Sequence, residues 1–262
     1  MKLHREEFLK GCQNPAGMEE LLIQAEIVFR TWQPTWSSFV SAPLREEAMR
    51  KLGPLTNLYW QTDGGHPGAE RQRMQCIRYK DQIPNTNQSA PIEGLLIAGN
   101  FLFDRASSKD FRKSLEMIGV PPGEIGDIWT KGDRGAQALC TTEAAKILDG
   151  RIGRVREVQI RCEIINKQEL QIPTPRLSRK FNTVEASTRL DAIASAGFGI
   201  SRAKIVTQIK QGRLRLNWLP VKQASKELVV GDRVQLEERG SIEILGLEIT
   251  KRQRWKIQLL RQ

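Results

Sequence analysis

The residues best suited to chemistry in this sequence are cations in its last third. Arg202 and Lys204 follow Ser201, which can cap a helix, while Arg213 and Arg215 alternate with leucines. Backbone amides at the start of a helix favour a bound phosphate, and a guanidinium can add two further hydrogen bonds to it. This combination predicts binding of phosphate groups rather than the making or breaking of bonds.

The net charge supports this hypothesis because it is localised. The whole chain carries 41 Lys and Arg against 30 Asp and Glu, a net charge of +11. Residues 176–262 hold 18 of these cations and 8 anions, a net of +10, whereas residues 1–175 hold 23 and 22. A neutral body with one basic third predicts a polyanionic partner. The alternative, that the cations only solvate exposed faces, weakens because four of them surround one predicted helix–strand junction.

Two short helices are predicted to position these cations. Thr188 and Asp191 have the spacing of a capping box at the start of the first helix. Gly197 and Gly199 allow a tight turn, and Ser201 is the expected N-cap of the second helix.

Strands are expected to follow the helices. Residues 213–218 alternate, which places Leu214, Leu216 and Trp218 inward and Arg213, Arg215 and Asn217 outward. Gly231-Asp232 predicts a turn into residues 233–237, and a hairpin is expected from 242–249 to 255–259 with a basic turn at 251–254.

A small unit of two helices and strands is better suited to recognising structured RNA by its shape than to recognising the sequence of its bases. About four to six phosphate contacts would give a salt-sensitive, largely sequence-independent affinity. The candidate RNA-binding residues are Arg189, Ser201, Arg202, Lys204, Gln208, Lys210, Arg213, Arg215, Asn217, Lys251, Arg252 and Arg254.

The upstream sequence predicts an α+β, multidomain chain. Residues 1–72 are expected to form a mainly helical N-terminal domain, because apolar residues recur at helical spacing from Met18 to Trp32. Residues 73–172 predict the order β-α-β-β-α-β, a ferredoxin-like, RRM-like α/β sandwich. Its expected strands at 95–97 and 137–140 carry no Phe or Tyr for base stacking, so a scaffold role is favoured. Residues 173–186 predict a Pro-containing basic linker, and 187–262 the basic domain with its C-terminal hairpin.

The sequence offers little for other chemistry. Four isolated cysteines and two histidines, with no Cys-x-x-Cys, predict buried reduced thiols and no metal site or cofactor. No apolar run is long enough to span a bilayer and no signal-peptide pattern opens the chain, so a cytoplasmic protein without a membrane span is expected.

The basic third resembles an S4 RNA-binding domain of the αL type over about residues 188–237. The resemblance rests on Arg189-Leu-Asp191, Ser201-Arg202, Gly212-Arg213 with Asn217, and Gly231-Asp232, in this order. Together with Asp110-Phe-Arg-x-x-Leu115 and Ile125-Gly-Asp-Ile128, it makes the chain similar to the YlmH family. The resemblance extends to the cyanobacterial and plastid branch called photosystem II S4 domain protein.

This resemblance implies a non-catalytic factor that binds rRNA and tRNA at the large ribosomal subunit in rescue of stalled ribosomes. In a photosynthetic eukaryote the corresponding location is the plastid stroma. One alternative is an RNA-modifying enzyme, although the chain has no Gly-rich cofactor loop after a strand and too few residues for a pseudouridine synthase domain. Another is a protein adaptor in photosystem biogenesis, docking through the neutral first 175 residues.

Overall fold

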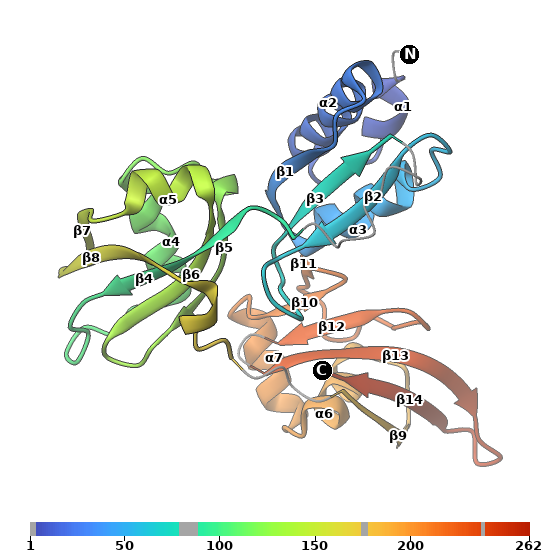
Figure 1. The fold of residues 1–262 in the computed structure, drawn as a ribbon. Coiled ribbons are helices and arrows are strands. Elements are labelled where there is room, and N and C mark those ends of the chain that lie inside the picture. Colours follow the sequence, from blue (N-terminus) through green and yellow to red (C-terminus); the bar gives the residue numbers. More distant parts are fainter. Residues whose placement is uncertain (1–3, 79–88, 174–177, 237–238) are drawn as a thin grey trace. The chain divides into compact units, whose positions relative to one another are not determined.

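The computed structural model describes residues 4–78, 89–173, 178–236 and 239–262, and the chain divides into two compact units, 1–173 and 174–262 (Figure 1). Within these described ranges, none of the helices has the length and apolar content needed to cross a membrane.

The first unit begins with helices packed on a small sheet. The core between them includes Leu21 and Leu22 from the second helix and Met74 and Cys76 from the sheet. The sheet is antiparallel with strand order β1-β3-β2. Its elements are α1 (Arg5–Leu9), α2 (Pro15–Thr31), β1 (Thr35–Val40), α3 (Ala42–Leu52), β2 (Tyr59–Asp63) and β3 (Gln72–Ile77).

The predicted N-terminal domain of residues 1–72 needs correction at its end. Its helices form the expected helical region, and a small sheet of three strands accompanies them. Residues 73–77 were expected to belong to the sandwich, but they form β3, which pairs with β1 and β2 and so belongs to the first domain. A register irregularity between Trp36 and Phe39 breaks the alternation of β1, which explains why its sequence gave no clear strand signal.

The second half of this unit is the predicted ferredoxin-like sandwich. Its five strands are all antiparallel in the order β5-β6-β4-β8-β7. The last strand of the predicted order, β8, is preceded by a short additional strand, β7, because the chain turns at Arg156, whose φ is +54°. The elements are β4 (Ile92–Ala98), α4 (Ser108–Met117), η2 (Pro122–Glu124), β5 (Ile125–Thr130), β6 (Gly135–Thr141), α5 (Thr142–Leu148), β7 (Ile152–Val155), β8 (Val158–Ile165) and η3 (Lys167–Glu169).

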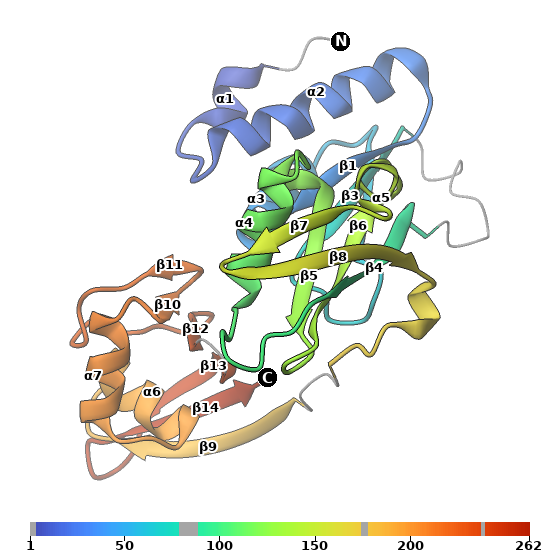
Figure 2. The ribbon, with the colours of Figure 1, turned by 90° about the vertical axis from the view of Figure 1, so that its left-hand side faces the viewer.

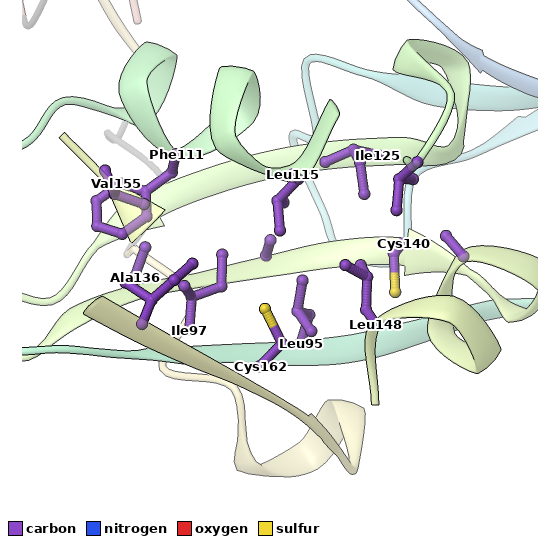
Figure 3. Close-up of a cluster of buried hydrophobic side chains, with 14 of the residues drawn as sticks. Leu95, Ile97, Phe111, Leu115, Ile125, Ala136, Cys140, Leu148, Val155 and Cys162 are labelled. Carbon is purple, nitrogen blue, oxygen red and sulfur yellow. The ribbon is translucent and has the colours of Figure 1, made fainter. Parts of the chain in front are cut away.

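Both helices of the sandwich cover one face of its sheet. Figure 3 shows Leu95 and Ile97 of β4 facing Phe111 and Leu115 of α4, with Cys162 of β8 beside them. All five side chains are at most 1% exposed, so this apolar layer is the main source of stability for the domain.

The opposite face of this sheet is covered by other residues of the same unit. Phe39 of β1 and Leu170, which follows η3, pack against Ile92 and Leu139. Gly126 leaves room for the ring of Phe39, since a Cβ there would lie 2.7 Å from a ring carbon. The face on which RRM domains stack bases is thus partly filled, and β4 and β6 carry no aromatic residue.

The loop after β2 is anchored on β5 by Asp127. Its carboxylate accepts hydrogen bonds from the backbone amides of Glu70 (2.8 Å) and Arg71 (2.9 Å), and it lies 3.3 Å from Nε2 of His66. Nδ1 of His66 lies 3.0 Å from the carbonyl oxygen of Pro67. Both ring nitrogens therefore face acceptors, an arrangement that only the protonated imidazole satisfies fully. The hydrogen bond to Asp127 accordingly raises the pKa of His66.

We expect His66→Gln to destabilise the protein by about 1–2 kcal/mol near pH 5.5 and by less near pH 8. A raised pKa in the folded state gives a stabilisation that is complete below the unfolded value of about 6.5 and lost as the pH rises through the folded value. Thermal unfolding at both pH values measures this, with His4→Gln as the control on an exposed histidine. An equal loss at both pH values would contradict the assignment.

The second unit is a six-stranded antiparallel sheet with strand order β11-β10-β12-β13-β14-β9. Two helices pack on one face of it, and their Ile193, Phe198 and Ile205 join a single apolar core with the strands. The elements are β9 (Arg179–Glu185), α6 (Leu190–Phe198), α7 (Arg202–Lys210), β10 (Leu214–Leu216), β11 (Leu219–Pro220), β12 (Arg233–Leu236), β13 (Gly240–Ile249) and β14 (Trp255–Arg261).

The linker predicted at 173–186 is wrong over most of its length. Residues 174–177 lie outside the described residues, but 179–185 form β9, which pairs with β14 along its whole length. Its basic start resembles a linker because an edge strand with one exposed side carries charge there. Phe181, in contrast, packs against the core.

Candidate nucleic-acid interface

The corner between α6 and α7 is fixed by local hydrogen bonds. Gly199 ends α6 in the left-handed conformation, with φ +66°, and the hydroxyl of Ser195 donates to the carbonyl oxygen of Ile200 over 2.6 Å. Gly197 allows close packing, since a Cβ there would lie 2.5 Å from Cδ1 of Ile242. The two glycines thus set the direction in which α7 begins.

The start of α6 differs from the predicted capping box. Arg189, not Thr188, is the N-cap, and the carbonyl oxygen of Thr188 accepts from the amide of Leu228. Asp191 instead binds the guanidinium of Arg189 through two hydrogen bonds of 3.0 and 3.1 Å, which raise the pKa of Arg189. Arg189 is therefore engaged by its own chain.

The first turn of α7 forms as the sequence predicts. The hydroxyl of Ser201 accepts a hydrogen bond from the amide of Lys204 at 3.3 Å, which makes Ser201 the N-cap. Arg202 turns toward β9, where its guanidinium lies 3.3 Å from the carboxylate of Glu185. The pair is half exposed, so its stabilisation is small. Lys204 is exposed and forms no ion pair with any part of the chain that is described.

A second group of cations lies at the other end of α7. Lys210 and Arg213 are exposed, and neither has an ion pair among the described residues. The amide of Arg213 donates to the carbonyl oxygen of Gln208, a half-buried residue of the last two turns. Lys204 lies in the first turn of α7 and Lys210 is its last residue, so about 9 Å of helix separates them. The cations were predicted to surround one helix–strand junction, but the structure places them in two groups, one at each end of α7.

Arg215 does not join either group. Leu214 and Leu216 point into the core beneath the helices, so Arg215 between them faces the opposite side of the sheet. The structure thus does not bring Arg215 together with Lys204.

Asn217 lies in a turn rather than on the outward face of a strand, and its side chain is hydrogen-bonded within the fold. The strand stops at Leu216, and Asn217 and Trp218 form a tight turn with φ values of +48° and +72°. The amide group of Asn217 donates to Asp232 (2.7 Å), and its oxygen accepts from the backbone amide of Arg233 (2.8 Å). Trp218 is in this turn and half-buried, so its predicted inward place on a strand is also wrong.

The basic turn between β13 and β14 forms where the sequence predicts it. Lys251, Arg252 and Arg254 are all exposed there, and the amide of Thr250 donates to the carbonyl oxygen of Arg254 over 2.7 Å. Figure 1 shows the tip of this hairpin projecting away from α7. It is a third, separate group of cations.

The exposed cations Lys222 and Lys226 were not among the residues predicted from the sequence. The amide of Val221 donates to the carbonyl oxygen of Leu214, so Lys222 lies beside the strand that follows Arg213. The carbonyl oxygen of Lys226 accepts from the amide of Leu190 at the start of α6. No periodicity marks these positions, since they lie in a loop whose path is set by tertiary hydrogen bonds.

No group of three His, Cys, Asp or Glu side chains within the described ranges could hold a metal ion. The four cysteines are free, and Cys76, Cys140 and Cys162 are buried as predicted, whereas Cys12 is half-buried. Burial raises the pKa of Cys76 and of Cys140 to about 12, so both remain thiols at neutral pH.

Comparison with known proteins identifies two segments of the chain. Residues 13–80 match the N-terminal domain of YlmH, and residues 188–234 match the S4 domain, an RNA-binding module. Both resemblances expected from the sequence are confirmed. The first match extends through β3, in agreement with the corrected end of the N-terminal domain.

A curated relative is the ribosome-associated protein quality control protein P2 of Bacillus subtilis (strain 168). It is 24% identical over 200 residues, which cover 76% of each protein. Among solved structures, the cell division protein ylmH from Streptococcus pneumoniae is 19% identical, with a TM-score of 0.45. The match covers 66% of this chain and 97% of the other.

Proposed function

We propose that this chain, which joins a YlmH N-terminal domain to an S4 domain, binds structured RNA on the ribosome. The RNA would be rRNA of the large subunit and tRNA bound to it, and the process would be rescue of stalled ribosomes. The name of the relative from Bacillus subtilis, a ribosome-associated quality control protein, supports this proposal. The proposed location is wherever the ribosomes are, the cytoplasm or a plastid stroma.

The observation that carries the proposal is the set of exposed cations without ion pairs, among the described residues, at both ends of α7. Lys204 lies at one end, and Lys210, Arg213 and Lys222 lie at the other. Cations that only stabilise the fold would be expected to have anionic partners, as Arg189 and Arg202 do. Groups separated by about one helix length can contact phosphates at more than one point of a folded RNA.

We propose further that the protein acts by binding and not by catalysis. Arg189 and Asp191, at the start of α6, bind each other. The buried thiols of Cys76, Cys140 and Cys162 lie inside apolar cores. These groups therefore stabilise the fold and are not available to a substrate. Turnover of a labelled RNA by the purified protein would contradict this part of the proposal.

Crosslinking to RNA in cells, followed by sequencing of the bound fragments, tests the proposed function. We expect fragments of large-subunit rRNA and of tRNA to be enriched over a sample that was not crosslinked. The matched control is the chain with Lys204→Glu and Arg213→Glu, which should lose most of this enrichment. Equal recovery with the control, or recovery of other RNA classes only, would contradict the proposal.

A further inference from the structure

The most exposed large apolar side chain of the described residues lies in the ferredoxin-like domain, far along the sequence from the S4 match. Phe103, in the segment between β4 and α4, is 95% exposed, and its neighbour Leu102 is 56% exposed. Isolated exposed apolar residues are common and need no explanation by themselves. Whether Phe103 indicates a binding site therefore depends on the residues around it.

The backbone around Phe103 is fixed on both sides. On one side Phe101 is 1% exposed, its ring lies 5.0 Å from that of Phe111, and its amide donates to the carbonyl oxygen of Asp133 over 2.7 Å. On the other side Asp104 forms an ion pair with Arg156 at 3.0 Å. The loop thus holds the Phe103 ring in water between two anchored residues, a preorganised arrangement that lowers the entropic cost of binding.

Three loops meet at this edge of the sheet. The antiparallel order β5-β6-β4-β8-β7 brings the end of β4, the β5–β6 turn and the β7–β8 turn to one edge. Both views show the segment after β4 and the β5–β6 turn at the same end of the domain (Figures 1 and 2). We call residues 99–109, 131–134 and 154–157 the Phe103 edge.

The Phe103 edge is positively charged. Each of its three segments has a net charge of +1, from six cations and three anions in all. One anion, Asp104, is neutralised by Arg156. Arg105 and Arg134 are exposed and have no ion pair in the part of the chain that the structure describes. The six cations are Arg105, Lys109, Lys131, Arg134, Arg154 and Arg156.

We propose that the Phe103 edge binds an unpaired nucleotide of an RNA. Phe103 stacks on the base, while Arg105 and Arg134 contact the flanking phosphates. An exposed aromatic ring beside guanidinium groups is the arrangement by which proteins hold single-stranded nucleic acid without reading its sequence. The site differs from the base-stacking face of RRM domains, because that face is packed against Phe39 and Leu170. This inference rests on the proposed RNA-binding function and adds a second contact to it.

The test uses the full chain and two labelled probes, an oligouridylate and a blunt RNA duplex, with affinities measured by fluorescence anisotropy. We expect Phe103→Ala to weaken binding of the oligouridylate about tenfold, within the roughly five- to hundredfold range of stacking aromatics. Binding of the duplex should change less than about twofold, because it offers no unpaired base. Phe103→Trp should retain the affinity, since its ring also stacks.

The matched control is Met117→Ala, which removes another apolar side chain, 79% exposed, from the same domain. It should leave both affinities unchanged. Equal binding of the oligouridylate by wild type and Phe103→Ala would overturn the inference while leaving the proposed function intact. So would an equal loss for both probes, because stacking requires an unpaired base. If the wild-type chain binds neither these probes nor rRNA, the proposed RNA-binding function is contradicted. The inference, which rests on that function, is then contradicted as well.

Discussion

Replacing Lys204 and Arg213 together by glutamate is expected to lower the affinity of the protein for large-subunit rRNA about 10- to 100-fold at moderate salt. Both side chains are exposed and without an ion pair among the described residues, so the change should leave the fold intact. Removing a cation that binds a phosphate weakens binding nearly uniformly across RNA sequences. Filter binding to rRNA measures the effect.

Two controls separate charge from structure in this experiment. Exchanging the two residues by Lys204→Arg and Arg213→Lys keeps the charge and should change the affinity only a few-fold. Lys146→Glu in α5 of the first unit alters net charge on an exposed helix outside the S4 match and should have little effect. A similar loss for Lys146→Glu would mean that overall charge, rather than this surface, determines binding.

Removing the side chain of Asn217 is expected to cause the largest loss of stability among substitutions of the predicted RNA-binding residues. Asn217→Ala deletes two hydrogen bonds that join the β10–β11 turn to Asp232 and Arg233. It also places alanine at φ +48°, a conformation that costs alanine about 1 kcal/mol. Together these effects predict a loss of about 2–3 kcal/mol. Hydrogen exchange measured on peptides of β10 and β12 reports this local opening within the second unit.

Asn217→Gly is the matched control because glycine tolerates the positive φ but lacks the amide group. We expect its loss to be about 1 kcal/mol smaller than that of Asn217→Ala. Affinity for rRNA should remain close to that of the wild type in both variants at temperatures where they are folded. A normal stability combined with lost binding would instead support a direct contact of Asn217 with RNA.

Several parts of the fold could be predicted because local patterns determine them. The ferredoxin-like order of elements followed from strands and helices with clear boundaries, such as α5 (Thr142–Leu148). Ser201 caps α7 as predicted, since an N-cap depends only on residues within one turn. The strand β1 was missed because its register is irregular, and β3 was assigned to the sandwich because it pairs with β1, which is distant in sequence.

The composition of the sequence predicted which part of the chain holds the candidate site, but not how the side chains of that site are arranged. The sequence located the basic third, but it could not show that Arg189 binds Asp191 or that Arg202 binds Glu185. The place of Arg215 depends on which face of a three-residue strand meets the helices, and the role of Asn217 depends on a turn to Asp232. Such outcomes arise from tertiary contacts between residues far apart in the sequence, which periodicity does not encode.

The salt dependence of binding to large-subunit rRNA tests the central claim most directly. With about four to six phosphate contacts, the logarithm of the association constant should fall with the logarithm of salt concentration with a slope of roughly −4 to −5. In the variant with Lys204→Glu and Arg213→Glu the slope should be shallower by about 2. A wild-type slope near zero, or the same slope in both proteins, would contradict the proposal that the cations at the ends of α7 bind RNA phosphates.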